Sequence, residues 1–323
     1  MLERISIVLL LLFLLQPRVR GQNPEPQSSP QGFTFEGRAL GSSNSLGSVT
    51  RLDTAAGYIF GPHWSVDLGV PFYFLNPSGT TQAAMGSSDT QGLGNVYGQV
   101  RLTLANPVLN YVSTITGTAP TGDRDKGLST GHGTVDWSNY FDHGIGRVTP
   151  FGEVGVANAV SDTQFFVRPY TSYGFVTHAQ GGARYRLARW LTAGASAYVI
   201  EPSGQQTVIS RVTTVRSSSV LPSAVNSVAN GVGISVGKGI GNIGNGVGNA
   251  LGLTKRVFET QSVTTGPADI ARDHGFSTWL LFNVTPKFDF YGGYTRSTRF
   301  DLNTVFFGMD VRLRKTLGSF GGL

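Results

Sequence analysis

Apolar and polar residues alternate one by one along a series of extended runs in this chain. The clearest run covers residues 64–74, in which Trp64, Val66 and Leu68 alternate with polar residues. Because successive side chains of a strand point to opposite faces, this pattern predicts strands with one apolar face and one polar face. Strands of about nine or more residues can cross a bilayer when they are tilted. The chain therefore needs an architecture with water on one face of its sheet and an apolar environment on the other.

The same alternation recurs along the whole chain and predicts twelve strands. They cover residues 32–40, 49–60, 64–74, 92–104, 109–118, 134–143, 148–160, 173–187, 190–200, 270–284, 287–297 and 302–314. Short turns join alternate pairs, at residues 61–63, 105–107, 144–147, 188–189 and 285–286, and mostly longer polar loops join the others. An even number of strands with this arrangement of connections is typical of bacterial outer-membrane barrels. We predict an all-β protein, a transmembrane antiparallel up-and-down β-barrel of about twelve strands that covers residues 32–315.

Charged residues are scarce in the sequence. They make up 14% of the chain, against roughly 25% in typical soluble domains. The alternative architecture is a soluble β-sandwich, but its strands are usually only about five or six residues long. The formal net charge of +6 fits attraction to the anionic headgroups of lipids. The Arg residues are scattered rather than interleaved with stacking aromatics, so no nucleic-acid partner is expected.

Both ends of the chain fall outside the predicted barrel. Residues 1–21 have the features of a secretory signal peptide, with Arg4 before an apolar stretch at 5–15 that is too short to span a bilayer. Residues 22–31, rich in Pro, Gln and Ser, predict a flexible periplasmic tail, and residues 316–323 a C-terminal tail. We therefore expect export to the bacterial outer membrane with cleavage of the signal peptide. The absence of Cys excludes a lipidated N-terminus, disulfides and thiolate metal sites.

The polar faces of the predicted strands carry charges of both signs. An Arg or Lys on the lipid face near the midplane would cost roughly 2–4 kcal/mol, so these side chains are expected to point into the lumen. The predicted lumen-lining residues are Arg51, Asp53, Arg101, Asp136, Glu153, His178, Arg184, Arg186, Asp289, Asp310 and Arg312. Two interpretations remain open: a polar lumen that filters solutes, or a charge network that fills a narrow lumen and braces its wall. The arginines at 184, 186, 312 and 314 favour a mild preference for anions.

Residues 203–266 form a long Gly-rich insertion whose role the sequence leaves open. Between residues 217 and 252 its apolar residues fall three or four apart, which is helical spacing. Each Gly costs about 1 kcal/mol in a helix, so such a helix would be marginal alone. The insertion is interpreted as a mobile outer loop, as a plug or gate in the lumen, or as an amphipathic segment on the membrane surface. Together with the loops at 75–91 and 119–132, it is expected to contribute to selectivity.

No catalytic or metal-binding motif stands out in the sequence. The five His residues are dispersed, and none has a partner at the spacing of a metal site. A lipid hydrolase is the enzymatic alternative, because two His residues flank Asp136 and Ser138. The first of them, His132, is followed two residues later by Thr134, which is a poor substitute for a Ser nucleophile. We therefore predict no enzymatic activity, no catalytic residue, no metal and no cofactor.

Four short segments resemble one outer-membrane family. They are residues 64–71 (WSVDLGVP), 92–96 (GLGNV), 119–123 (APTGD) and 127–131 (GLSTG). In this order and spacing they resemble the family of transporters of the phenol-degradation meta pathway, and the likeness extends over most of the chain except residues 203–266. The resemblance implies a bacterial outer-membrane barrel that passes small, often aromatic or hydrophobic, compounds.

The expected function is a passive outer-membrane channel or transporter for small molecules, with aromatic or hydrophobic compounds as the class that the resemblance implies. The expected partners are outer-membrane lipid, the barrel assembly machinery and a small-molecule solute, and the protein is expected to act as a monomer. The main alternative is a non-conducting surface barrel whose loops bind a partner or a polymer. The lipid hydrolase is the third and weakest interpretation.

Overall fold

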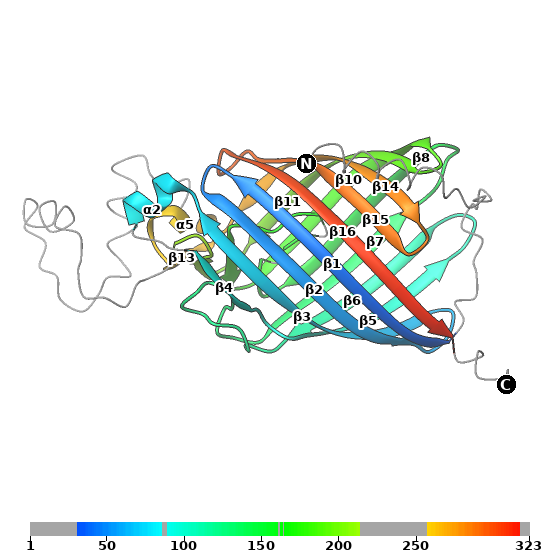
Figure 1. Ribbon diagram of the computed structural model, residues 1–323, viewed down its shortest axis with the longest axis horizontal. Coiled ribbons are helices and arrows are strands. Elements are labelled where there is room, and N and C mark those ends of the chain that lie inside the picture. The colour runs from blue at the N-terminus through cyan, green and yellow to red at the C-terminus, as the bar shows by residue number, and fades with distance from the viewer. Residues whose placement is uncertain (1–30, 86–88, 161, 164, 214–256, 317–323) are drawn as a thin grey trace, which may run out of the picture.

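A closed barrel forms most of the structure. The computed structural model describes residues 31–85, 89–160, 162–163, 165–213 and 257–316. Within them, twelve antiparallel strands form a single barrel (Figure 1). These strands are β1 (Gly32–Asn44), β2 (Gly47–Ile59), β3 (Trp64–Pro77), β5 (Tyr97–Ala105), β6 (Asn110–Thr118), β7 (Thr134–Asp142), β8 (Val148–Ala157), β10 (Val176–Ala188), β11 (Leu191–Pro202), β14 (Asp273–Thr285), β15 (Phe288–Ser297) and β16 (Leu302–Thr316). The predicted signal peptide and nearly all of the two predicted tails lie outside the described residues.

Each barrel strand pairs with its neighbours in up-and-down order, and the first and last strands close the sheet. β1 pairs with β16 along a register that runs from Ser43 opposite Val305 to Gly32 opposite Thr316. Closure of this kind leaves the barrel wall without a free strand edge. The predicted fold class, an all-β antiparallel up-and-down barrel of about twelve strands, is confirmed.

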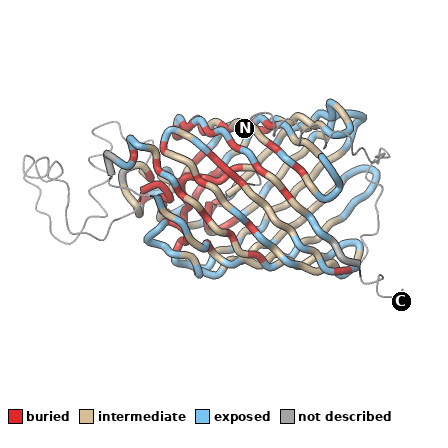
Figure 2. Tube along the Cα trace, in the orientation of Figure 1, coloured by how far each residue is buried: buried red, intermediate tan, exposed pale blue. Residues whose placement is uncertain are grey.

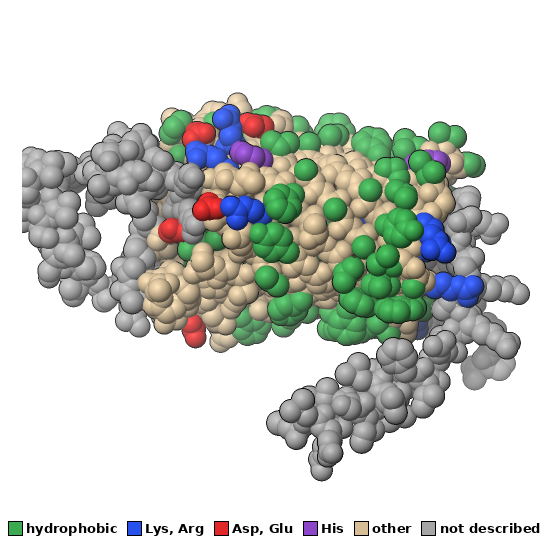
Figure 3. Space-filling view, turned by 90° about the horizontal axis from the view of Figure 1, so that it is seen from above, with side chains coloured by type: hydrophobic (Ala, Val, Ile, Leu, Met, Phe, Trp, Pro, Cys, Tyr) green, Lys and Arg blue, Asp and Glu red, His purple; other side chains and the backbone are tan. Residues whose placement is uncertain are grey.

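The outside of the barrel is apolar. Large apolar side chains are exposed on strands around the barrel, and Phe33, Leu68, Ile115 and Phe307 are each more than half exposed. Figure 3 shows charged side chains near the two ends of the barrel and mainly hydrophobic or uncharged ones between them. Monomeric soluble proteins rarely expose so wide an apolar surface, whereas a barrel in a bilayer presents an apolar band to the hydrocarbon. The exterior therefore suits a membrane, and the polar faces of the strands turn inward.

The two ends of the barrel differ in their connections (Figure 1). β1 begins and β16 ends at the end that carries the short turns. The opposite end carries the longer loops, with two exceptions: the link between β1 and β2, and the link at residues 298–301 between β15 and β16. The sequence predicts that the first strand ends at residue 40 and that the second begins at residue 49. In the structure both strands are longer and are joined by a tight turn. Asn44 stabilises this turn, because its Oδ1 accepts a hydrogen bond from the backbone N–H of Leu46 at 2.9 Å.

The predicted strand at residues 92–104 is two strands in the structure. β4 (Thr90–Leu93) pairs with the part of β3 nearer the long loops, and β5 pairs with the part nearer the short turns. Between them, Gly94 donates its N–H to the carbonyl of Pro71 at 2.8 Å. A Cβ on Gly94 would lie 2.5 Å from the ring of Tyr73. Alternation along the chain misses this break, because a close contact with a different strand sets it.

A small three-stranded sheet, which we call the cap sheet, lies at the long-loop end. It contains β9 (Tyr170–Tyr173), β12 (Gln205–Ser210) and β13 (Val263–Pro267), in the order β13-β12-β9. Tyr170 stacks on Phe258 with 4.6 Å between ring centroids, and Phe300 packs edge-on against both rings. Figure 2 shows that buried residues are concentrated toward this end of the molecule.

The cap sheet changes the picture of the predicted insertion. The sequence interprets residues 203–266 as one Gly-rich loop, but β12 and β13 lie at its two ends. They pair with each other, so the insertion leaves the barrel and returns to it through a built structure. Its predicted helical stretch at 217–252 lies outside the described residues.

The helices within the described residues are short. They are α2 (Gly79–Met85), α5 (Val257–Thr260) and the 3₁₀ helix η2 (Ala268–Ile270). Among the described residues, no helix is both long enough and apolar enough to cross a membrane.

Candidate functional site

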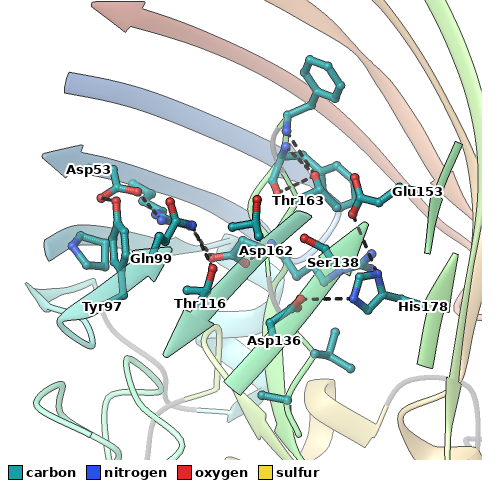
Figure 4. A pocket seen from close by; sticks show the side chains of 18 of the residues that line it. Asp53, Tyr97, Gln99, Thr116, Asp136, Ser138, Glu153, Asp162, Thr163 and His178 are labelled. Carbon is teal, nitrogen blue, oxygen red and sulfur yellow. Dashed lines mark hydrogen bonds and ion pairs between the residues drawn. The ribbon is translucent and has the colours of Figure 1, made fainter. Parts of the chain in front are cut away.

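The inward faces of the barrel strands surround a cavity of about 870 Å³. Thr103 of β5 and Asp142 of β7 line it near the short turns, and Thr118 of β6 and Thr130 line it near the long loops. The cavity therefore extends along most of the height of the wall. Figure 4 shows side chains from opposite sides of the barrel pointing into it.

Most of the predicted lumen-lining residues border this cavity. The bordering residues are Arg51, Asp53, Arg101, Asp136, Glu153, His178, Arg184, Asp310 and Arg312. Asp289 does not border the cavity itself, but its buried carboxylate is paired with Arg312. Arg186 is exposed near the short turns and is not among the residues that border the cavity, so its place in the lumen stays a prediction. Whether these residues select solutes stays a prediction.

Several arginines of the lumen have carboxylate partners. Nε of Arg38 lies 2.9 Å from Oδ1 of Asp310, and Arg51 is paired with Asp53 on the same strand. Arg184 and Arg312 are paired with Asp142 and Asp289 in the same way. Two members of the predicted arginine cluster are thus neutralised, and Arg186 is not among the residues that border the cavity. This removes much of the free positive charge on which the expected preference for anions rests.

A segment that the sequence treats as an outer loop enters the lumen. We call residues 158–160, 162–163 and 165–169, between β8 and β9, the crossing segment. In the strand order of the barrel, β8 lies opposite β1. The backbone N–H of Val167 nevertheless donates a hydrogen bond to Oγ of Ser42 on β1, at 2.8 Å. The segment therefore spans the lumen from one wall to the other.

Phe165 anchors the crossing segment to inward-facing aromatic rings. It stacks on Trp279 of β14 with 4.7 Å between centroids, and contacts Tyr291 of β15 edge-on at 5.5 Å. Its ring is also 6.2 Å from that of Phe306 on β16. The segment thus covers one side of the barrel, formed by β14, β15, β16, β1, β2 and β3, which we call the covered wall.

The side chain of Asp162 connects the crossing segment to several parts of the chain. Its Oδ1 accepts hydrogen bonds from Nη1 of Arg211 at 2.5 Å and from the backbone N–H of Arg168 at 3.0 Å. Its Oδ2 accepts from the hydroxyl of Tyr73 at 3.1 Å and lies 3.5 Å from Nη1 of Arg51. Burial opposes the charge of this carboxylate, but Arg211 and Arg51 outweigh burial and hold the pKa of Asp162 below its usual value.

A second buried ion pair holds the end of the crossing segment. Nη1 of Arg168 donates to Oδ2 of Asp273 at 2.8 Å, and the two side chains are only 4% and 1% exposed. Asp273 also accepts hydrogen bonds from Tyr198 at 3.1 Å and from Ser297 at 2.6 Å. Burial opposes the charge of Arg168, but Tyr170, Tyr198 and Asp273 together outweigh it and raise the pKa of Arg168. The segment is therefore fastened at two points by charges that are removed from water.

The other side of the barrel, formed by β5, β6, β7 and β8, is the open wall. Its inward residues are largely hydroxyls and amides. Gln99 donates to Oγ1 of Thr116 at 3.0 Å, and the hydroxyls of Thr118 and Thr134 lie 2.6 Å apart. Ser138 also borders the cavity on this side, facing the crossing segment (Figure 4). These short polar side chains leave room for water between the open wall and the crossing segment.

The open wall also carries two carboxylates beside one imidazole. Nε2 of His178, on the adjacent strand β10, lies 3.5 Å from Oδ1 of Asp136, and its Nδ1 lies 4.0 Å from Oε1 of Glu153. The ring reaches Asp136 across Gly155, where a Cβ would come within 2.4 Å of the imidazole. Figure 4 shows these three side chains on one side of the cavity, with Asp162 nearer its middle. The charge on this side is therefore mainly negative.

The hydrolase arrangement that the sequence offers as an alternative is not assembled. The His that approaches Asp136 is His178, whereas the ring of His132 stacks on Tyr173 of the cap sheet with 4.3 Å between centroids. His143 lies beyond the end of β7, near the short turns. Among the described residues, no group of three His, Asp or Glu side chains could hold a metal ion.

The sequence reasoning missed the residues that hold the crossing segment. Asp162, Phe165, Arg168 and Arg211 all lie in stretches that it assigns to loops. One signal could have found them, because two adjacent aromatic residues, Phe165 and Phe166, are followed by Val167. Such an apolar cluster is unusual in a loop that remains in water. It indicates a loop that packs against something else.

Comparison with known proteins identifies the fold. No protein-family model and no curated protein matches the sequence. Among solved structures, the chain is similar to an outer membrane channel from Pseudomonas putida F1, with a TM-score of 0.53 and 12% identity, covering 91% of this chain and 100% of that chain. The NanC porin gives a TM-score of 0.43 at 9% identity (86% and 100% covered), and the KdgM porin in complex with oligogalacturonate 0.42 at 6% (86% and 98% covered).

At these identities the likeness to the Pseudomonas channel shows the fold alone, and the two porins are too distant to carry an argument. By name, the first neighbour is an outer membrane channel and the other two are porins. Membership of the phenol-degradation transporter family stays a prediction.

Proposed function

We propose that the protein is a passive channel of the bacterial outer membrane, through which small hydrophilic solutes diffuse along the open wall. One observation carries this proposal. Inside an apolar exterior, a cavity of about 870 Å³ extends along the strands between the crossing segment and a wall of Thr, Ser and Gln side chains. Such side chains exchange hydrogen bonds with water and with polar solutes at little cost, because they have no fixed charge to desolvate.

The proposed location and assembly rest on the architecture. The first strand begins and the last strand ends at the short-turn end. Bacterial outer-membrane barrels have the same arrangement, and their short turns face the periplasm. The long loops and the cap sheet would then face the outside of the cell. The sheet closes without a partner, which supports a monomer that the barrel assembly machinery inserts into outer-membrane lipid.

A second candidate class of solute is the aromatic or hydrophobic one that the sequence resemblance implies. Phe151, Phe165 and Trp279 border the same cavity, and they favour this class. However, Phe165 stacks on Trp279 and so occupies much of this aromatic surface. The polar open wall therefore makes hydrophilic solutes the first choice.

Planar-bilayer recording of the purified full-length protein tests the proposal. We expect steady channels in salt solution, and swelling of protein-containing vesicles in small sugar alcohols that is faster than in matched protein-free vesicles. Influx of benzyl alcohol that depends on the protein while sugar alcohols are excluded would replace the hydrophilic class by the aromatic one. Electrical silence of protein that keeps its barrel-like resistance to cold detergent would contradict the channel and leave the surface-binding barrel.

A further inference from the structure

We propose that Asp162 is a positioning residue that pins the crossing segment across the lumen and thereby sets the size limit of the channel. This inference rests on the proposed channel function. It concerns a single carboxylate that joins parts of the chain which are far apart in sequence.

Asp162 contacts three parts of the structure: the barrel wall, the crossing segment and, through Arg211, the cap sheet. On the barrel wall it meets Tyr73 of β3 and Arg51 of β2. Within the crossing segment it accepts from the backbone of Arg168. Through Arg211, which directly follows β12, it meets the cap sheet. The cap sheet and the crossing segment are therefore held to the wall as one inserted body.

The two arginines paired with Asp162 depend on it to different degrees. Arg51 has a second carboxylate partner in Asp53. Among the ion pairs of the described residues, Arg211 has Asp162 as its carboxylate, and its side chain is only 7% exposed. Removing one member of a buried ion pair leaves the other as an uncompensated charge, which is strongly unfavourable. Neutralising Asp162 would therefore drive Arg211, and the chain around it, toward water.

The contacts of Tyr73 add to the same pin. The centroid of its ring lies 5.0 Å from the guanidinium carbon of Arg211 and 6.0 Å from that of Arg51, so two cations lie close to the ring. Its hydroxyl donates to Asp162. A cation near an aromatic ring gains more when the pair is removed from water. The pin is thus a compact group of two arginines, one tyrosine and one carboxylate.

The crossing segment would loosen rather than leave the lumen when the pin is broken. Its far end remains fastened by the buried ion pair with Asp273, which the side chain of Arg168 makes, whereas Asp162 contacts only the backbone N–H of Arg168. Phe165 also keeps its stacking on Trp279. The expected result is a wider and less steady passage, with the barrel itself intact.

The experiment measures how large a polyethylene glycol must be before it no longer enters the channel and lowers its conductance. The full-length Asp162→Asn protein is compared with the wild type in planar bilayers. We expect the size limit to shift to longer polymers and the open-channel noise to rise. The matched control is Glu201→Gln, which breaks the ion pair with Arg272, and neither residue of this pair borders the cavity. It should leave the size limit unchanged.

Two further variants keep the test decisive if Asp162→Asn folds poorly. Tyr73→Phe removes one hydrogen bond and no charge, so it should shift the limit in the same direction by a smaller amount. The double variant Asp162→Asn with Arg211→Met removes both buried charges and should return the limit toward the wild type, because nothing remains to be hydrated. Resistance to cold detergent, followed on gels, confirms that each barrel is folded.

Cross-linking shows whether a change in the size limit comes from movement of the crossing segment or from the loss of the Asp162 charge alone. The chain has no Cys, so cysteines placed at Ser42 and Val167, whose Oγ and N are 2.8 Å apart, are the only thiols present. In the Asp162→Asn background, a short bifunctional thiol reagent should restore the wild-type size limit. A size limit that is unchanged in folded Asp162→Asn would overturn the pin while the channel stands. A silent wild-type protein would overturn the channel and the pin together.

Discussion

The covered and open walls are built by the same alternation of residues but hold different contents. Strands β1, β2, β3 and β16 of the covered wall have 13 to 15 residues, whereas β5, β6 and β7 of the open wall have nine each. Inward residues of the covered wall include arginines with carboxylate partners and large aromatic rings, and those of the open wall include a series of Thr and Ser hydroxyls together with carboxylates. The polar face of a barrel strand is therefore not one kind of surface.

Energetics explain why one wall holds a protein segment and the other is left to solvent. Aromatic rings such as Trp279 and Tyr291 gain free energy when another ring excludes water from them. Paired charges can be buried with a partner that completes their hydrogen bonds. Hydroxyls such as that of Thr116 gain little from burial, because water already satisfies them. Side-chain content, rather than the barrel geometry, decides where the crossing segment lies.

The largest expected effect comes from breaking the buried ion pair of the covered wall. Asp273→Asn leaves Arg168 as an uncompensated buried charge, so the free energy of unfolding should fall by about 3–5 kcal/mol. Glu201→Gln is the control, because its pair with Arg272 is nearly half exposed and should contribute no more than about 1 kcal/mol. Urea titration in lipid vesicles, followed by Trp fluorescence, measures both. Equal losses would show that the two ion pairs do not differ as described.

A smaller effect is expected from filling a glycine notch in the covered wall. A Cβ at Gly308 of β16 would lie 2.1 Å from the buried ring of Tyr291, so Gly308→Ala must displace this ring and should cost about 1–3 kcal/mol. Gly117 of β6 has nothing within 4 Å of its added Cβ, and Gly117→Ala should be neutral or slightly stabilising. The same urea titration compares them. A loss at Gly117 as large as that at Gly308 would remove the distinction between the two sides.

The smallest effect concerns the charge of the open wall and is seen in ion selectivity rather than stability. Asp136→Asn with Glu153→Gln removes two carboxylates that face the passage beside His178. Cations should then permeate less well relative to anions, because the local potential becomes less negative. The reversal potential in a salt gradient measures this shift. Lys287→Gln, in the short turn between β14 and β15 and not among the residues that border the cavity, should leave the potential in place, and an equal shift there would refute the assignment of the passage.

Much of the wall could be predicted from the sequence, because alternation is a local property. The run at 64–74 indicated both that a strand exists and which side chains face inward. The crossing segment could not be predicted in the same way, because the contact between Val167 and Ser42 joins residues 125 positions apart. No periodicity near Val167 records it. The break between β4 and β5 was missed for the same reason, since Gly94 and Tyr73 belong to different strands.

The docking point of the crossing segment has a consequence for how the chain is completed. Ser42, which holds Val167, and Phe306, which meets Phe165, face each other in the register that joins the first strand to the last. The rung that turns an open sheet into a cylinder is thus also the rung on which the interior segment rests. A chain that stops before β16 lacks the strand that closes the barrel against β1. It also lacks Phe306, one of the residues on which the crossing segment packs. Closure of the barrel and docking of the crossing segment therefore depend on the same pair of residues.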